Sequence, residues 1–392
     1  MSFIELGEWG ADFTANPYPY YAKLRESGPV HHIRMPDGWE FWLVVGHEEG
    51  RAALADPRLV KSPSVIDFVP VDEEVIGPNL LAVDPPDHTR LRKLVAREFT
   101  GRRVEALRPR IQELADELVD AMAPAGRADL VDSFAFPLPM TVICELLGVP
   151  AADRDSFRRW SNELVAPAGG TPAREVVEGF GAYLDELIEN KRASGPKDDL
   201  LSALIATRAE DGDRLSLPEL RGMAYLLLVA GHETTVGLIT NTMRALFAHP
   251  DQLAELRADF GLLGGVIEEG LRYDGPVETT TFRIAKEPTT VGGVDIPARS
   301  AVFVSLAAAD RDPKRFPEPD RFDIRREPRG HLSFGHGIHY CLGAPLARLE
   351  GAIAIRTLLE RFPRLELDPD GAPWEWMPGL LVRGVRRLPV RW

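Results

Sequence analysis

Cysteine is scarce in this chain, which has two, Cys144 and Cys341, among 392 residues. Two cysteines so far apart in the sequence do not make the disulfide framework of a small secreted domain. The first residues, MSFIELGEWGADF, have no basic segment followed by an apolar run, so they resemble neither a signal peptide nor a membrane anchor. We therefore expect a protein of the reduced cytoplasm.

Long apolar runs and positive charge are also scarce. No stretch approaches the roughly 20 apolar residues that a membrane-spanning helix requires. The formal net charge is -14 and the isoelectric point is about 5.2, which argues against broad binding to nucleic acid. We expect neither a membrane nor a nucleic acid among the partners of this chain.

Repeats, low-complexity linkers and Pro/Gly-rich joints are absent as well, so we predict a single domain over residues 1–392. The segments GPVHHI and EFWLVVG are typical of strands, and GHEEGRAALADP is typical of a helix. Residues 87–210 are predicted to be helical. Spacings of three and four there place one set of apolar residues on a single helix face: Val104, Leu107, Ile111, Leu114, Leu118 and Met122.

The segment SPSVIDFVPVDEEVIGPN, residues 62–79, has three prolines and no sustained period, which indicates an irregular loop. Strand-like segments return after residue 276, in TTFRIA, TTVGG and AVFVSLA. A helix is predicted from Leu342 to Phe362, and the last residues, LLVRGVRRLPVRW, are typical of a β hairpin. The fold class is therefore mainly α with a minor β region.

One very long helix is predicted from Ser216 to His249. It opens with SLPE, where Ser216 and Glu219 can form a capping box. At 1.5 Å per residue this helix would be roughly 45–50 Å long. Its middle, LLLVAGHETTVGLIT, is apolar nearly all round, so we expect it to be buried. His232, Glu233 and Thr234 interrupt that apolar run.

Residues 334–343, FGHGIHYCLG, combine a cysteine with three glycines at the start of a predicted helix. Three interpretations are open from these residues alone. Cys341 can be a buried structural cysteine, or it can join His336 and His339 in a zinc site, although no regular fourth ligand follows. Its place at a helix N-terminus also stabilises a thiolate, which is the form that ligates haem iron.

The run F-G-x-G-x-H-x-C-x-G resembles the haem-binding loop of the cytochromes P-450. The resemblance implies the triangular-prism haem-thiolate fold, with the long helix over the cofactor. It implies that Cys341 ligates the iron of haem b, that Phe334 shields the sulfur, and that Gly335 and Gly343 let the backbone approach the cofactor. A thiolate ligand favours O–O cleavage of bound O2.

Other motifs agree with this resemblance. Glu269 and Arg272 are three residues apart on one helix face and resemble the ExxR pair of the family, to which Arg321 would add a third, structural member. In AGHETT, residues 230–235, the resemblance assigns Thr234 to oxygen and proton handling, with Glu233 as its acid partner. Thr234 can also bond back to the carbonyl of Ala230, which would lie beside the haem.

Four further positions match those that contact haem propionates in the family: His88, Arg92, Arg283 and His339. Basic side chains such as these suit carboxylates. The same resemblance places a substrate pocket at Val83, Val229, Val277, Thr279 and Leu381. Nearby acids of the loop, Asp67, Asp72, Glu73 and Glu74, are either solvated or contact a cationic group of the substrate.

The resemblance is closest to soluble bacterial enzymes that oxidise macrolides and other polyketides. It implies a monooxygenase that hydroxylates or epoxidises a small apolar molecule. Electrons would come from a ferredoxin and its NAD(P)H-dependent reductase, docking near Arg102, Arg103 and Arg348. Haem-thiolate oxidative coupling and a non-catalytic, gas-binding haem protein are the alternatives.

Overall fold

The computed structural model describes residues 3–62, 75–150, 174–208, 212–327 and 330–392, together with positions 153, 156, 160, 163 and 164. Most of the predicted loop at residues 62–79 lies outside this part of the chain. The same holds for its acids, Asp67, Asp72, Glu73 and Glu74. Both alternatives for these acids, solvation and contact with a cationic group of the substrate, therefore stay predictions.

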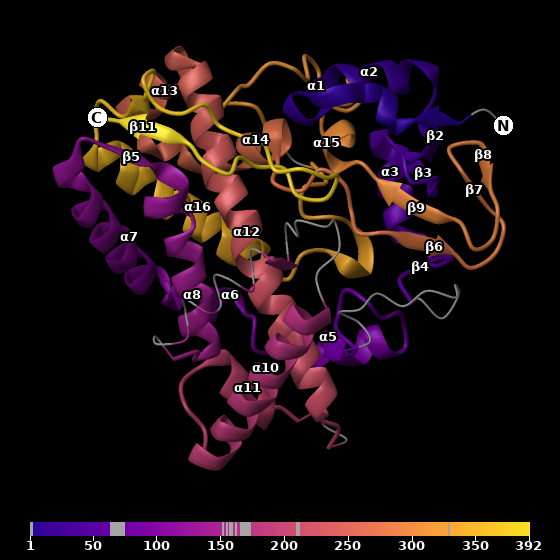
Figure 1. Ribbon diagram of the computed structural model, residues 1–392, viewed down its shortest axis with the longest axis horizontal. Helices are drawn as coiled ribbons and strands as arrows, with labels where there is room; N and C mark the ends of the chain where they lie inside the picture. Colours follow the sequence, from indigo (N-terminus) through magenta and orange to yellow (C-terminus); the bar gives the residue numbers. More distant parts are fainter. Residues whose placement is uncertain are drawn as a thin grey trace.

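Helices form most of the described structure (Figure 1). They are α1 (Gly10–Ala15), α2 (Tyr18–Ser27), α3 (His47–Ala55), α5 (Asp87–Ala96), α6 (Gly101–Ala106), α7 (Arg108–Met122), α8 (Pro137–Leu147), α10 (Arg174–Ser194), α11 (Leu200–Ala206), α12 (Leu217–Ala248), α13 (Pro250–Ala258), α14 (Leu263–Asp274), α15 (Leu306–Ala309) and α16 (Ala344–Arg361). A π-helix occupies Val131–Ala135, and short 3-10 helices include Gly337–His339.

The apolar face predicted from Val104 to Met122 is divided between two helices. Helix α6 ends at Ala106 and α7 begins at Arg108. The sequence signal for this break is Pro109, which lies in the first turn of α7, where a missing backbone N–H costs nothing. Val104, Ile111 and Met122 are nevertheless all buried in the same core.

In the described residues, the β region consists of three small sheets. The largest has the order β1 (Ile4–Glu5), β2 (Val30–Arg34), β3 (Glu40–Val44), β9 (Ala301–Val304), β6 (Arg283–Ala285) and β4 (Leu59–Val60). The second joins β10 (Glu366–Leu367), β11 (Pro389–Arg391) and β5 (Arg127–Asp129), and the third joins β7 (Thr289–Val291) to β8 (Val294–Ile296).

Strands β2 and β3 pair antiparallel, with Val30 opposite Val44, as the sequence predicts. The prediction of a C-terminal hairpin was wrong. Strand β11 pairs with β10 on one side and with β5, more than 250 residues earlier in the chain, on the other. Val382 forms a bridge with Val277 instead of pairing locally.

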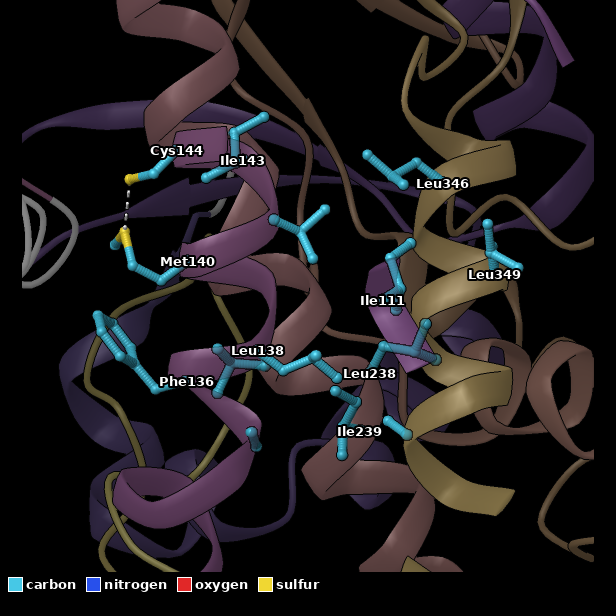
Figure 2. Packing of buried hydrophobic residues seen from close by; sticks show 14 of the residues in the cluster. Ile111, Phe136, Leu138, Met140, Ile143, Cys144, Leu238, Ile239, Leu346 and Leu349 are labelled. Atoms are coloured by element: carbon cyan, nitrogen blue, oxygen red, sulfur yellow. Dashed lines mark hydrogen bonds between the residues drawn. The ribbon is translucent and has the colours of Figure 1, made fainter. Parts of the chain in front are cut away.

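Helix α12 crosses the molecule and organises its core (Figure 1). Its N-terminus is the predicted capping box, in which Ser216 and Glu219 satisfy each other's backbone N–H groups. It packs against α8, α10, α14 and α16, and Figure 2 shows side chains of α8, α12 and α16 meeting in this core. The approach to α16 is close, because a Cβ added at Gly351 would lie 3.0 Å from Leu238.

Helix α12 is also the one helix of the described residues that is long and apolar enough to cross a membrane. No such segment is expected from the apolar runs of the sequence. However, 67% of its most apolar window is buried inside the protein. Burial on this scale is what the central helix of a packed domain shows, so its composition reflects the core.

Candidate active site

The loop before α16 presents Cys341 at the start of a helix. Gly335 and Gly337 have φ of 73° and 75°, the left-handed region that favours glycine. A Cβ at Gly337 would also lie 2.8 Å from the carbonyl oxygen of Leu54. The backbone N–H of Cys341 donates to the carbonyl of Phe334 at 2.9 Å, which closes the loop.

The thiol of Cys341 has opposing influences on its pKa. The residue as a whole is exposed, but protein atoms surround its sulfur, and the resulting desolvation raises the pKa. Hydrogen bonds from the backbone N–H groups of Gly343 and Ala344, with the nearby charge of Arg92, act in the opposite direction. These hydrogen bonds and the charge of Arg92 would stabilise the thiolate form of Cys341 when its sulfur binds a metal cation.

The zinc interpretation finds no support. Within the described part of the chain, which includes His336, His339 and Cys341, no three His, Cys, Asp or Glu side chains gather in a way that could hold a metal ion. Nδ1 of His339 instead lies 3.1 Å from the carbonyl oxygen of Leu80.

Phe334 is held by a charged network beneath the loop. The guanidinium of Arg348 lies 4.4 Å from the centre of the Phe334 ring. Arg348 forms a two-bond ion pair with Glu268, which also lies 3.0 Å from His331. Burial alone would raise the pKa of Glu268, but the hydrogen bonds from His331 and Arg348 lower it to about 2. The charge of Arg348 is therefore largely compensated within the protein.

The four predicted propionate contacts come together from three segments of the chain, since His88 and Arg92 both lie on α5. The rings of His88 and His339 are 4.5 Å apart, and Arg92 donates to the carbonyl of Tyr340 at 2.8 Å. Arg283 is 4% exposed, and its Nη1 reaches only the carbonyl of Leu59, at 3.3 Å.

This basic cluster is incompletely satisfied. Among the residues that the structure describes, Nε2 of His88, Nε2 of His339 and Nε of Arg283 are buried and find no hydrogen-bond partner. Burial, then the neighbouring positive charges of Arg283, Lys61 and His88, lower the pKa of His339 to about 3. Burial also lowers the pKa of Arg283 to about 10. Buried nitrogen atoms without partners, gathered beside several positive charges, fit a ligand with carboxylates, so these residues fit the propionates of haem.

The middle of α12 opens on one side. Ala230 is exposed and Thr234 half-buried in a helix that is otherwise mostly buried. The hydroxyl of Thr234 donates to the carbonyl of Ala230 at 2.9 Å, as predicted. Oε1 of Glu233 lies 3.5 Å from Nε2 of His232, whose Nδ1 lies 2.7 Å from the carbonyl oxygen of Leu228. An acid and an alcohol thus adjoin an accessible helix face.

The pair Glu269–Arg272 is present and completely buried, with two hydrogen bonds of 2.7 Å each. The third member differs from the prediction. The side chain of Arg321 is 59% exposed and turns to Glu318 and Asp323, so only its backbone carbonyl joins the network. Arg326 contacts Glu269 at 3.4 Å and is 13% exposed. We therefore assign Arg326, and not the side chain of Arg321, as the third member of this network.

The predicted pocket residues Val277, Thr279 and Leu381 belong to two segments, 277–281 and 380–382, that lie against each other. The N–H of Glu278 donates to the carbonyl of Leu381 at 2.9 Å. Thr279 is 1% exposed and its hydroxyl donates to the carbonyl of Leu380, so this hydroxyl connects the two segments and is not free for a ligand. Val277 is half-buried, whereas Leu381 is 45% exposed.

The other two pocket residues, Val83 and Val229, are half-buried and pack against the main core. The sequence analysis missed Lys61, Glu278 and Glu350, three charged residues that are at most 4% exposed. Lys61 has a weak signal, since it directly follows a strand. Glu278 and Glu350 have none, because nothing local marks a burial that distant segments produce.

The sequence profile of the cytochrome P-450 family matches residues 170–388. The cytochrome P-450 monooxygenase PikC of Streptomyces venezuelae is 56% identical over 392 residues, which cover 99% of this chain and 94% of PikC. The chain belongs to the cytochrome P-450 family. The 6-deoxyerythronolide B hydroxylase of Saccharopolyspora erythraea is 47% identical, over 97% of this chain and 96% of that enzyme.

Solved structures of the family agree. A myxobacterial cytochrome P-450 in complex with myristic acid superposes with a TM-score of 0.91 at 43% identity, covering 97% of this chain and 98% of its own. The chain is thus a cytochrome P-450 monooxygenase with the predicted fold, which uses haem b and O2. It is closely related to macrolide and polyketide hydroxylases and epoxidases.

Proposed function

We propose that this monooxygenase hydroxylates or epoxidises a polyketide-type small molecule, with electrons supplied by a ferredoxin and its NAD(P)H-dependent reductase. The proposal includes its action in the cytoplasm, as a single domain over residues 1–392. Its substrate class is supported by relatives such as 6-deoxyerythronolide B hydroxylase. Exposed Leu381 and half-buried Val277 and Val229 supply apolar surface suited to such a ligand.

The observation that carries the assignment of the site is the unsatisfied basic cluster. Cys341 would ligate the iron, while Arg92 and Arg283 with His88 and His339 would hold the propionates. Arg92 joins the two functions, because it donates to the carbonyl of Tyr340 next to the cysteine. Bound in this way, haem supplies the iron at which O2 is activated, and the thiolate favours O–O cleavage.

Two side chains of α12, Glu233 and Thr234, would supply protons for the reaction. Glu233, 12% exposed, would exchange a proton with the neighbouring hydroxyl of Thr234 at Oγ1, which faces the open side of α12. The bond from Thr234 to the Ala230 carbonyl holds that hydroxyl in place until it donates elsewhere. The role is general acid catalysis by a positioned side chain, typically a rate factor of about 10²–10⁴.

Replacement of each cysteine in turn tests this assignment. We expect the reduced carbon monoxide complex of the haem-loaded protein to show a thiolate-type Soret band that is lost in Cys341→Ala. Cys144→Ala is the matched control, because Cys144 is buried in the core beside Met140 and should leave the band unchanged. A thiolate band that persists in Cys341→Ala would refute the assignment of the ligand.

A further inference from the structure

A buried carboxyl group lies where the two pocket segments meet. Glu278 is 3% exposed and stands between Val277, which bridges to Val382, and Thr279, which is bonded to Leu380. Its carboxylate accepts a hydrogen bond of 2.6 Å from the hydroxyl of Tyr21. Glu278 therefore connects helix α2, near the start of the chain, to both segments.

The positive charge nearest to Glu278 is already engaged elsewhere. Nη1 of Arg383 lies 3.9 Å from Glu278, whereas Nε of Arg383 donates to Asp274 at 2.6 Å. Asp274 also accepts hydrogen bonds from Tyr18 at 2.6 Å and from Arg244 at 3.2 Å. Of the two buried carboxyl groups, Asp274 is well compensated and Glu278 is not.

The ionisation of Glu278 follows from this imbalance. Burial raises its pKa to about 7, while Arg383 and Tyr21 oppose the shift and Asp274 adds to it. These three residues are the titratable or charged groups that influence the carboxyl from α2, from the end of α14 and from the C-terminal segment. The backbone carbonyl of Glu278 is fixed separately, by the N–H of Ala307 and by Ser305.

We propose that Glu278 and Tyr21 are positioning residues that hold segments 277–281 and 380–382 in register, and that ionisation of the buried Glu278 carboxyl changes the shape of the substrate pocket. The neutral carboxyl keeps the hydrogen bond from Tyr21 and carries no charge that would draw Arg383 away from Asp274. The ionised carboxyl competes with Asp274 for Arg383. The backbone N–H of Arg383 donates to the carbonyl of Pro276, the residue before segment 277–281, and Arg383 itself directly follows segment 380–382. Movement of Arg383 is therefore transmitted to both segments.

The statement that these segments line a substrate pocket rests on the proposed function. The connection that Glu278 and Tyr21 make between the segments can be tested without measuring activity. Amide hydrogen exchange of residues 277–282 and 380–385 would be followed in the haem-loaded protein at about pH 6 and about pH 8.5, corrected for intrinsic rates. Three variants are compared with the unmodified chain: Tyr21→Phe, Glu278→Gln and Tyr20→Phe. Tyr20 is the matched control, since it directly precedes Tyr21 in α2 and packs on Trp9 and Phe13.

We expect Tyr21→Phe to speed exchange in both segments about tenfold at either pH, because a buried carboxyl loses its donor. In the unmodified chain, protection of both segments should fall about threefold or more as Glu278 ionises. Glu278→Gln keeps the size and the acceptor but does not titrate, so it should abolish this pH dependence. Helix α16 should exchange equally in all variants.

A ligand pair reports on the pocket itself. The ratio of the spectral dissociation constants of 4-phenylimidazole and imidazole isolates the phenyl contact, because both bind iron in the same way. At about pH 8 we expect Tyr21→Phe to change this ratio about threefold or more, and Tyr20→Phe to leave it unaltered. A merely structural loss of stability would not alter the ratio selectively.

Two results would overturn the proposal: equal exchange in Tyr21→Phe and Tyr20→Phe, or a pH dependence that survives in Glu278→Gln. Failure of the proposed function is recognised separately. If Cys341→Ala retains the thiolate band, the haem ligand is wrong, yet the exchange measurements still decide whether Glu278 and Tyr21 hold the segments together.

Discussion

At the scale of single residues, the most unusual group is Glu350 of α16. It is completely buried, its Oε2 finds no hydrogen-bond partner within the described part of the chain, and a hydrogen bond from the Thr235 side chain supports it. Burial raises the pKa of its carboxyl to about 8. At neutral pH this side chain is therefore mainly protonated, directly beneath the helix that carries Glu233 and Thr234.

This raised pKa has a measurable consequence for stability. The folded protein holds a proton that the unfolded chain releases above about pH 4.5, so the contribution of Glu350 is complete below that value and is lost as pH rises through about 8. Glu350→Gln does not titrate. Relative to the unmodified chain, this variant should gain stability between pH 5 and 8, by a few kcal/mol at most, at about 1.4 kcal/mol per pKa unit.

Denaturant unfolding across this pH range checks the expectation. Glu360→Gln, on the same helix but exposed and paired with Arg356, is the control and should show no such trend. A difference between Glu350→Gln and the unmodified chain that stays constant with pH would contradict the shifted pKa.

At the scale of elements, the correction from Arg321 to Arg326 makes a second prediction. Arg326 donates to the carbonyls of Pro317, Glu318 and Arg321 besides contacting Glu269. Arg326→Ala should lower the free energy of unfolding by about 1–3 kcal/mol, because the fully buried carboxylate of Glu269 loses a charged partner. Arg321→Ala removes only exposed ion pairs and should cost less than about 0.5 kcal/mol.

Thermal unfolding of the haem-loaded variants distinguishes the two arginines. The expected order is a clear fall in Tm for Arg326→Ala and almost none for Arg321→Ala. The reverse order would restore Arg321 as the third member of the network with Glu269 and Arg272.

What the sequence could predict at this scale was local. The capping box of α12, the i,i+3 pair Glu269–Arg272 and the bond from Thr234 to Ala230 each depend on residues within one or two helical turns. The C-terminal hairpin failed because β11 pairs with β10 and β5 instead of with the residues just before it, and no local pattern encodes the distant pairing with β5. Arg321 failed for a related reason, since residues 313–327 have no periodicity that would fix which side chains turn inward.

The residues of the site also divide into those that the sequence could predict and those that it could not. The motif around Cys341 identified the loop, and the resemblance supplied the four basic positions, which do meet in space. Lys61, Glu278 and Glu350 escaped notice because their burial comes from segments hundreds of residues away, including α2 for Glu278. A buried charge is a property of the packed core, so only the assembled structure reveals it.

At the scale of the whole molecule, the remaining question is how a ferredoxin would dock on an acidic protein. Of the three arginines predicted for this face, Arg348 is paired with Glu268, and Arg103 with Glu98 at 2.6 Å. Arg102, at the start of α6, is exposed. A fixed acid beside a basic residue cancels most of its field at a distance, so Arg102 should contribute the larger share of any attraction.

Charge reversal tests this order. We expect Arg102→Glu to lower kcat/KM for ferredoxin about tenfold at low salt and to flatten its salt dependence, since long-range attraction is screened at a Debye length of about 10 Å. Arg348→Gln should have a smaller effect on that slope, because it removes a compensated charge. Lys23→Glu on α2, far from α6 in Figure 1, controls for the change in net charge. If Arg102→Glu and Lys23→Glu change the salt dependence equally, the docking face lies elsewhere on the molecule.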